Sequence, residues 1–442
     1  MDRHDEGAGT GSVVALLVSV FCSSAAAMAQ ATVLGKVVYD LTSSELDLGL
    51  LGLLEFAPAF LLVLVTGAVA DRFDRRKVAA AGAASEAVVA AALGWYAGRN
   101  PTSVTPIFVL VVLFGVGRAF AAPAARSMPA DMMPPSRLPW LVARNSGAWQ
   151  AAIIVGPVMG GLLYTVNVRL PFAASAVLLI VAATTILLVR LRPRAEVPGG
   201  PAAEPSPAEI RAAAAREAAV EPAEGHTTAA APGGGSVHDA MEGLRFVRRQ
   251  PILLGAISLD LVAVLFGGAV ALLPAIAKDR LGVGAVGLGW LRAAGGIGAG
   301  ITTLGLAARP LARRVGRTLL LVVALFGLFT IVLGVTRNFT VAFVAMIALS
   351  GADAVSVFIR ATLVPLVTPD DKRGRVLAVE NVFIGASNEL GAFESGVLGQ
   401  LIGTSGSVIF GGLATLATSL GWYFLFPALR KVDRFPRAPV RN

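Results

Sequence analysis

About twelve apolar stretches recur along this chain, each roughly as long as the 20 residues that an α-helix needs to cross a bilayer. They lie near residues 12–35, 46–69, 78–97, 104–127, 144–165, 170–190, 252–277, 284–307, 317–336, 339–366, 377–402 and 406–427. Backbone polar groups in hydrocarbon need partners within their own segment, which favours helices. The sequence therefore predicts an all-α integral membrane protein. Its mean hydropathy of +0.73, together with 49 glycines and a hydrophobic content of 55%, excludes a soluble domain with a polar surface.

A long polar interruption divides these segments six and six. Its first part is rich in Ala, Pro and Glu, which is typical of a flexible linker. Two helices are expected within it, one over 207–220 and an amphipathic one in SVHDAMEGLRFVRRQP that lies along the membrane surface. We expect four regions: an N-terminal six-helix bundle in 1–190, a cytoplasmic linker with the interfacial helix in 191–250, a C-terminal six-helix bundle in 251–430, and a cytoplasmic tail in 431–442.

The two halves repeat a short motif. GAVADRFDRR, residues 67–76, aligns without a gap with GLAARPLARR, residues 305–314, and shares its first glycine and its two final arginines. Repeated six-helix halves are typical of transporters, in which the substrate path runs between the halves near the bilayer midplane.

The basic residues are concentrated in alternate loops between the apolar segments. The net charge of +9 by itself could suggest binding to nucleic acid. Because the basic residues do not form one patch, nucleic-acid binding is not expected. The positive-inside rule places the basic loops and both termini in the cytoplasm and the chain in a cell membrane. The basic loops follow the second, fourth, eighth and tenth segments and contain Arg72, Arg75, Arg76, Lys77, Arg137, Arg144, Arg309, Arg313, Arg314, Arg317, Lys372, Arg373 and Arg375.

The residues that most enzymes and metal sites use are scarce in the apolar segments. The single cysteine, Cys22, excludes a disulfide framework, and the three histidines lie outside the predicted spans. A phosphate-binding Gly-x-x-x-x-Gly-Lys-Ser/Thr loop is also missing. We therefore expect no metal, no cofactor and no enzymatic activity, and a transporter driven by an ion gradient or by downhill diffusion.

GAVADRFDRRK resembles the signature of the major facilitator superfamily between its second and third helices, Gly-x-x-x-Asp-Arg-x-Gly-Arg-Arg-Lys, with Asp74 where glycine is usual. RGRVLAVENVFIGASNELGAFESG, residues 373–396, and GADAVSVFIR, residues 351–360, resemble the bacterial subfamily that includes the enterobactin exporter. The resemblance implies two six-helix halves related by pseudo-two-fold symmetry, and alternating-access transport by a monomer in the bilayer.

The same resemblance implies a gate at the cytoplasmic side. Asp71 can pair with an arginine or a helix N-terminus across the seam of its half, while arginines further along reach the opposite side. The alternative is that the basic residues only fix the topology. The predicted gate consists of Gly67, Asp71, Arg72, Arg75 and Arg76.

GPVMGG, residues 156–161, contains small residues that allow two helices to approach closely. Gly156, Pro157 and Gly160 resemble the core of a motif found in antiporters of the superfamily. They favour export, although close packing alone also explains them.

Ionisable residues inside the spans are the candidates for proton coupling or for the substrate cavity, because a charge in the membrane is costly unless it is paired or hydrated. Asp353 and Glu389 are the preferred proton sites, and Arg118 resembles the arginine associated with proton coupling in exporters. Arg292 and Glu394 also lie within spans. Each of these residues could instead form a static ion pair or, as Arg292 and Glu394 most readily could, reach the membrane interface from the end of a span. The candidates are Glu55, Arg118, Asp260, Asp353, Arg360 and Glu389.

The sequence thus predicts a proton-coupled exporter of a small amphipathic molecule, such as a siderophore, a drug or another secondary metabolite. A proton-coupled importer and a transport-inactive membrane scaffold remain the alternatives.

Overall fold

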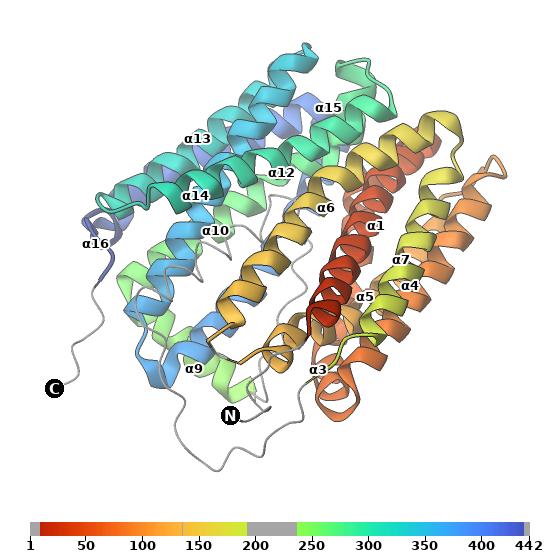
Figure 1. The fold of residues 1–442 in the computed structure, drawn as a ribbon. Coiled ribbons are helices and arrows are strands. Elements are labelled where there is room, and N and C mark those ends of the chain that lie inside the picture. The colour runs from red at the N-terminus through yellow and green to blue at the C-terminus, as the bar shows by residue number, and fades with distance from the viewer. Residues whose placement is uncertain (1–8, 135, 192–236, 437–442) are drawn as a thin grey trace, which may run out of the picture.

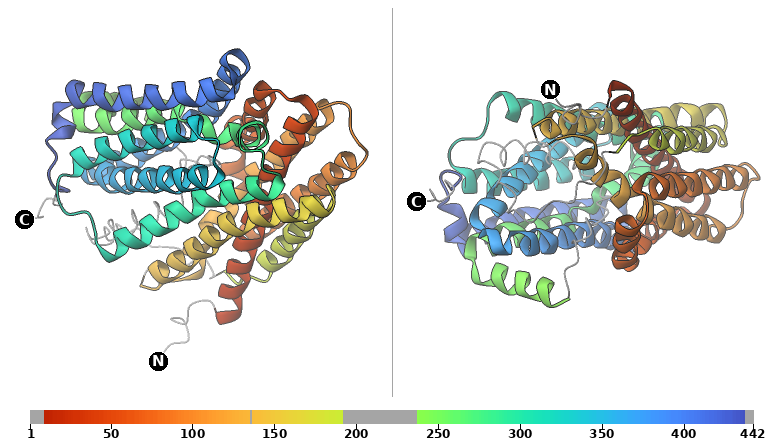
Figure 2. Two further views of the ribbon diagram at one scale, coloured as in Figure 1. Left: turned by 90° about the horizontal axis from the view of Figure 1, so that it is seen from above. Right: turned by 60° about the horizontal axis from the view of Figure 1, so that its bottom comes forward.

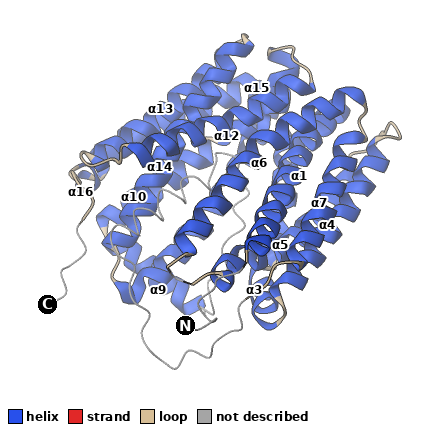
Figure 3. Ribbon diagram, viewed as in Figure 1, coloured by secondary structure: helices blue, strands red, loops and turns tan. Residues whose placement is uncertain are grey.

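A computed structural model describes residues 9–134, 136–191 and 237–436 of the chain. The helix expected over 207–220 lies outside the described residues. Every regular element of the described part is helical, and none of it forms a strand (Figure 3). The all-α prediction is therefore confirmed.

The helices form two groups that lie side by side (Figures 1 and 2). The first group contains α1 (Thr10–Thr42), α2 (Glu45–Leu61), α3 (Val63–Arg72), α4 (Arg75–Ala97), α5 (Thr105–Met132), α6 (Leu138–Val166) and α7 (Leu170–Leu187). After α9 (Val237–Arg249), the second contains α10 (Pro251–Phe266), η1 (Gly268–Leu272), α11 (Leu273–Ala275), η2 (Ile276–Arg280), α12 (Ala285–Ala308), α13 (Val315–Val335), α14 (Phe339–Val367), α15 (Asp370–Leu425) and α16 (Pro427–Arg430).

Among the described residues, nine helices are long and apolar enough to cross a membrane by length and composition. Four of the twelve predicted spans account for the difference. The span near 46–69 is divided into α2 and α3 at Leu62, the span near 284–307 is the glycine-rich α12, and the last two spans share α15.

Helix α15 reverses direction at Gly403. This residue has φ 79° and ψ 156°, a conformation that residues with a Cβ rarely adopt. Beyond it the chain folds back, because Ser407 Oγ donates a hydrogen bond to the carbonyl oxygen of Ser395 at 2.8 Å. Two antiparallel arms, 370–402 and 404–425, therefore correspond to the two predicted spans.

The span expected near 252–277 is not one continuous helix. It changes at Gly267 from α10 to the 3-10 segment η1 and ends in the π-helical η2. A Cβ on Gly268 would overlap the carbonyl oxygen of Gly391 in α15, so the two backbones are in direct contact at this break. Pro274 further weakens the helix because it cannot donate a backbone hydrogen bond.

The two groups meet along α6 with α12 and α2 with α15. At these crossings glycine brings backbones together: a Cβ on Gly49 would lie 2.9 Å from the carbonyl oxygen of Ala392, and one on Gly396 would lie 2.7 Å from that of Glu45. We call the end of the bundle that carries the loops between α3 and α4, α5 and α6, α12 and α13, and α14 and α15 the basic end. The α2–α15 contact lies toward the other end, the far end.

The contact between α6 and α12 also begins at the far end, where Gly161 faces the backbone of Ala285. It continues to Gln150 and Gly300. Gly305 lies about 160° around α12 from Gly289, on the side turned away from α6, and nothing lies within 4 Å of a Cβ added there. The two groups are therefore closed together at the far end, and from this crossing the ribbons of α6 and α12 diverge toward the basic end (Figure 1).

This packing predicts opposite effects for two glycines of α12. In Gly289→Leu the new side chain must enter the space occupied by the backbone of Pro157, and overpacking of this kind costs about 1–3 kcal/mol. We expect a lower melting temperature in detergent, whereas Gly305→Leu, on an open face of the same helix, should melt like the wild type. Equal melting temperatures for the two variants would contradict the close contact.

Candidate functional site

A cavity of about 120 Å³ lies between the two groups of helices. Its wall is mostly apolar, as in most small-molecule sites, with a few polar side chains. These polar residues come from both groups, so either group can respond to what occupies the cavity. They are Glu55 of α2, Arg292 of α12, Asp353 of α14, and Asn388 and Glu389 of α15.

Glu389 connects the two groups directly. Its side chain is buried, and a Cβ on Gly52 of α2 would lie 3.1 Å from its Oε2 atom. Gly52 is one helical turn from Glu55, which lines the same cavity. Glu389 of the second group therefore lies against the α2 backbone of the first group, near Glu55.

Behind the cavity, Arg360 of α14 is the centre of a buried ion network. Its guanidinium lies 2.8 Å from Asp260 of α10 and 3.7 Å from Glu380 of α15, and the three side chains are only 4%, 7% and 8% exposed. Asp353 lies two turns earlier on α14, and the charges of both Asp260 and Arg360 act on it. The network ties three helices together and adjoins the cavity through Asp353.

The first group also contains a buried acid, Glu86 of α4. The charges of Arg118 on α5 and Glu55 on α2 act on it. Glu86 and Glu380 were not among the predicted site residues. Each is an acid within a predicted span, 78–97 or 377–402, so the same argument about charges in membranes applies to both.

The structure thus separates the six predicted residues into three places. Glu55, Asp353 and Glu389 line the cavity, Asp260 and Arg360 form the network behind it, and Arg118 lies on α5, from where its charge acts on Glu86.

Arg292, for which the membrane interface was the alternative, lines the cavity, with its Nε atom buried. The reason is that α12 extends two turns beyond it toward the far end and turns this face to the other helices.

The predicted gate motif makes its described contacts within the first group. Arg75 pairs with Asp131 of α5 at 2.6 Å, and Arg76 donates to the carbonyl oxygen of Val189, just after α7, at 3.1 Å. The side chain of Asp71 lies outside the described residues. The motif therefore joins α4 to α5 and to the end of α7, and its gating role stays a prediction.

Asp74, which replaces the usual glycine of the motif, caps α4. Its carboxylate accepts a hydrogen bond from the backbone N–H of Arg76 at 3.0 Å and pairs with the guanidinium of the same residue at 2.7 Å. Hydrogen bonds from Arg76 hold the pKa of Asp74 below its usual range. The substitution therefore has a structural role as a helix N-cap.

The small residues of GPVMGG pack on both sides of α6. A Cβ on Gly156 would lie 2.6 Å from the carbonyl oxygen of Ala25 in α1, and one on Gly160 would lie 2.9 Å from that of Ala29. The Pro157 carbonyl faces Gly289 of α12. Close packing accounts for all three predicted residues.

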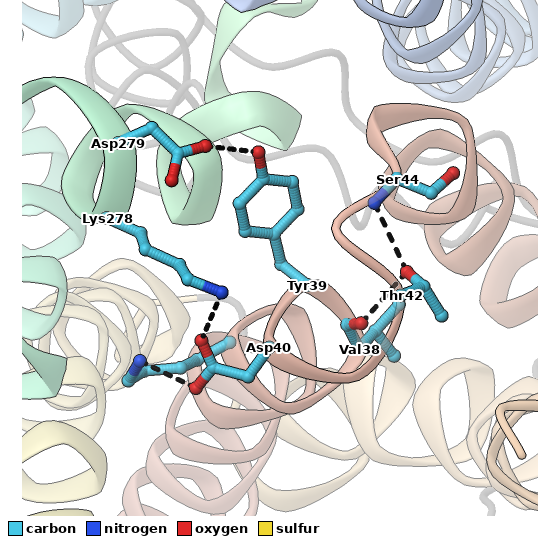
Figure 4. A network of polar contacts seen from close by, with 8 residues as sticks. Val38, Tyr39, Asp40, Thr42, Ser44, Lys278 and Asp279 are labelled. Atoms are coloured by element: carbon cyan, nitrogen blue, oxygen red, sulfur yellow. Dashed lines mark hydrogen bonds and ion pairs between the residues drawn. The ribbon is translucent and has the colours of Figure 1, made fainter. Parts of the chain in front are cut away.

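At the far end, polar side chains join the two groups (Figure 4). Tyr39 of α1 donates a hydrogen bond to Asp279 of η2, and Asp40 pairs with Lys278 at 3.2 Å and with Lys36 at 2.7 Å. We call Lys36, Tyr39, Asp40, Lys278 and Asp279 the far-end latch. Nearby, Glu45 accepts a hydrogen bond from Thr404 at 2.7 Å. Among the described residues, no cluster of three His, Cys, Asp or Glu is placed to hold a metal ion.

A family model described as Major Facilitator Superfamily matches residues 16–337, which is well over half of the chain. The chain belongs to the Major Facilitator Superfamily. Membership of this superfamily makes it a secondary transporter with a multi-pass membrane fold.

Solved structures show the same fold at low identity. A POT family transporter in complex with 5-aminolevulinic acid has a TM-score of 0.70 at 12% identity, with 95% of this chain and 96% of that chain covered. A bacterial homologue of the human lysosomal transporter Spinster, in an inward-facing and unoccupied conformation, has a TM-score of 0.65 at 16% identity. The match covers 96% of this chain and 98% of that chain. The human organic anion transporter TETRAN has a TM-score of 0.59 at 15% identity, with 93% of this chain and 99% of that chain covered.

A curated relative matches a shorter segment. The tetracenomycin C resistance and export protein of Streptomyces glaucescens is 34% identical over 101 residues, which is 23% of this chain and 18% of that protein. The match thus spans less than a fifth of the relative's length. The resemblance to the enterobactin exporter subfamily stays a prediction.

The far-end latch of this superfamily member yields a prediction about its closed end. Asp40→Lys would place a third cation beside Lys36 and Lys278. Because the three charges repel one another, we expect the variant to favour separation of the two groups at the far end. Exposed ion pairs contribute at most about 1 kcal/mol, which corresponds to roughly a fivefold shift. Leu48 lines the cavity, and the labelling rate of a cysteine there, measured in Leu48→Cys on a Cys22→Ser background, should rise accordingly.

The charge-swapped variant Asp40→Lys with Lys278→Asp should restore much of the slow labelling. Arg337→Gln, which removes an exposed charge outside the latch, is the control. An unchanged labelling rate in Asp40→Lys would show that the latch does not hold the far end.

The Arg360 network yields a prediction about stability. Arg360→Leu leaves two carboxylates buried without their cation, which should cost about 3–5 kcal/mol. Replacing Asp260, Arg360 and Glu380 together by leucine removes the charges as well, so it should recover much of the lost melting temperature. If Arg360→Leu melted at the same temperature as the wild type, the network would not be structural.

Proposed function

We propose that this superfamily member is a proton-coupled exporter of a small amphipathic molecule and that it works by alternating access. The observation that carries this proposal is the charged cavity between the two groups, where Glu389 of one group rests on the α2 backbone of the other. Substrate or a proton at that position acts on both groups at once.

The arrangement of the halves supports a state that opens toward the basic end. The groups are joined at the far end by α2 with α15 and by the far-end latch, whereas α6 and α12 diverge toward the basic end (Figure 1). The positive-inside rule makes the basic end cytoplasmic, together with both termini. The proposed state is therefore inward-facing, ready to receive a cytoplasmic substrate in a cell membrane.

Two of the cavity acids are suited to carry the proton. Asp353 and Glu389 lie on adjacent helices of the second group, and a carboxylate that is partly removed from water costs less when it is protonated. An arriving cationic or hydrogen-bonding group can replace the proton. Competition between substrate and proton for one site is the simplest way in which a gradient can drive export.

The cavity wall supports an amphipathic substrate. Apolar side chains such as Met28, Leu51 and Phe326 form most of it, while acids and one arginine provide charges of both signs. A siderophore, a drug or another secondary metabolite fits this description. The Streptomyces relative is a resistance and export protein, which supports export over import.

The proposal predicts a split between two activities in Asp353→Asn and Glu389→Gln. If one of these acids carries the proton, its amide should abolish proton-driven accumulation yet permit counterflow exchange, because substrate can still bind and be reoriented. Both activities are measured in proteoliposomes with one fluorescent amphipathic compound, chosen because cells that express the protein retain less of it.

Glu394→Gln is the matched control, since Glu394 lies on the same helix as Glu389 but does not line the cavity. It should keep both activities. If both cavity variants still accumulate substrate against its gradient, neither acid is the coupling site. Accumulation in vesicles of the opposite orientation would show import.

A further inference from the structure

Helix α9 is firmly attached to the basic end of the second group. Glu242 pairs with Arg375 of α15 at 2.9 Å, and the ammonium of Lys372 lies 5.1 Å from the ring centre of Phe246. Val247 is only 2% exposed. It packs in a small core with Leu253, Ile257, Val364 and Val376. One face of α9 is therefore fixed by α10, α14 and α15.

The opposite face of α9 has no such contacts. Met241 is 46% exposed, and Arg245, Arg248 and Arg249 are exposed as well. Positions four, seven and eight residues after the first lie on one side of a helix. We call these four residues the outer face of α9. Within the described residues, no carboxylate forms an ion pair with its three guanidinium groups.

The outer face lies where the membrane surface is expected. Gln250 has extended backbone angles, φ −107° and ψ 103°, and α10 begins its crossing at the next residue, Pro251. The chain turns at this point, so α9 lies across the end of the bundle and at its outer edge (Figures 1 and 2). At 13 residues, α9 extends roughly 20 Å along this edge.

We propose that the outer face of α9 binds the headgroups of anionic phospholipids in the leaflet at the basic end. A guanidinium donates two parallel hydrogen bonds to a phosphate, and clustered arginines next to a membrane span are attracted to anionic lipid. Met241 adds an apolar group that can enter the boundary between headgroups and acyl chains. The arginines of the outer face thus complement the negative charge of the headgroups, and Met241 complements the apolar region beneath them.

Lipid bound at this face would act on transport through α15. The Glu242–Arg375 pair attaches α9 to the first turns of the helix that carries Glu380 of the buried network and Glu389 of the cavity. A lipid-anchored α9 thus fixes the start of α15 relative to the bilayer. The inference goes beyond the proposed function, since it needs no particular substrate or direction.

The experiment places an environment-sensitive fluorophore on α9 of the full-length protein. Met241→Cys on a Cys22→Ser background provides one labelling site, and the protein is studied in nanodiscs of phosphatidylcholine with increasing phosphatidylglycerol. We expect the fluorescence to report an increasingly apolar environment as phosphatidylglycerol increases, and the response to weaken at high salt.

Each arginine near an anionic surface adds to the attraction, so combined replacement of Arg245, Arg248 and Arg249 by glutamine should abolish the response. The matched control replaces Arg309, Arg313 and Arg317 by glutamine, which removes three exposed charges at the same end and should leave the response unchanged. An equal loss in both triple variants would overturn the proposal, because overall charge would then explain the effect. A wild-type signal that ignores phosphatidylglycerol would also overturn it and would favour another occupant, such as an acidic protein.

Discussion

The charge of Arg360 inside the bilayer imposes the constraint on which the second half depends. A guanidinium at this depth must be neutralised by protein, and carboxylates from α10 and α15 do so. Removing all three charges need not cost stability, whereas removing one does. The network therefore acts mainly by fixing which helices stay together. Because α10, α14 and α15 are joined behind the cavity, Asp353 is presented to the cavity from a rigid wall.

Closure at the far end relies on weak forces that can be reversed. Lipid is as apolar as the helix surfaces, so the halves gain from close contacts at small residues such as Gly49 and Gly396 rather than from a hydrophobic effect. The Asp40–Lys278 pair is about one-third exposed on both sides, and pairs of this kind contribute at most about 1 kcal/mol. A closure held this lightly can open within a transport cycle, whereas the buried network cannot be broken so easily.

The sequence predicted the crossings but not what happens at their ends. Hydropathy ends the first span near residue 35 because Lys36 and Asp40 are polar, yet α1 continues to Thr42, and this extension holds one half of the far-end latch. The buried charges can be recognised one by one as ionisable residues within apolar spans, and Glu86 and Glu380 meet this criterion as well as the six predicted residues do. Their pairing could not be predicted, since Arg360 and Asp260 are 100 positions apart and meet only through tertiary packing.

The first arm of α15 couples closure of the far end to the surroundings of the Glu389 carboxylate. Glu389 rests on Gly52 of α2, and Gly396, two turns further along the same helix face, rests on Gly49. A continuous helix moves as a rod over such a distance, so α2 cannot leave Gly396 without also leaving Glu389. In the proposed cycle, opening of the far end therefore removes the backbone of one half from the acid of the other and exposes that carboxylate to water. Protonation of Glu389 and the position of the halves are then linked by packing alone, with no need for a longer pathway.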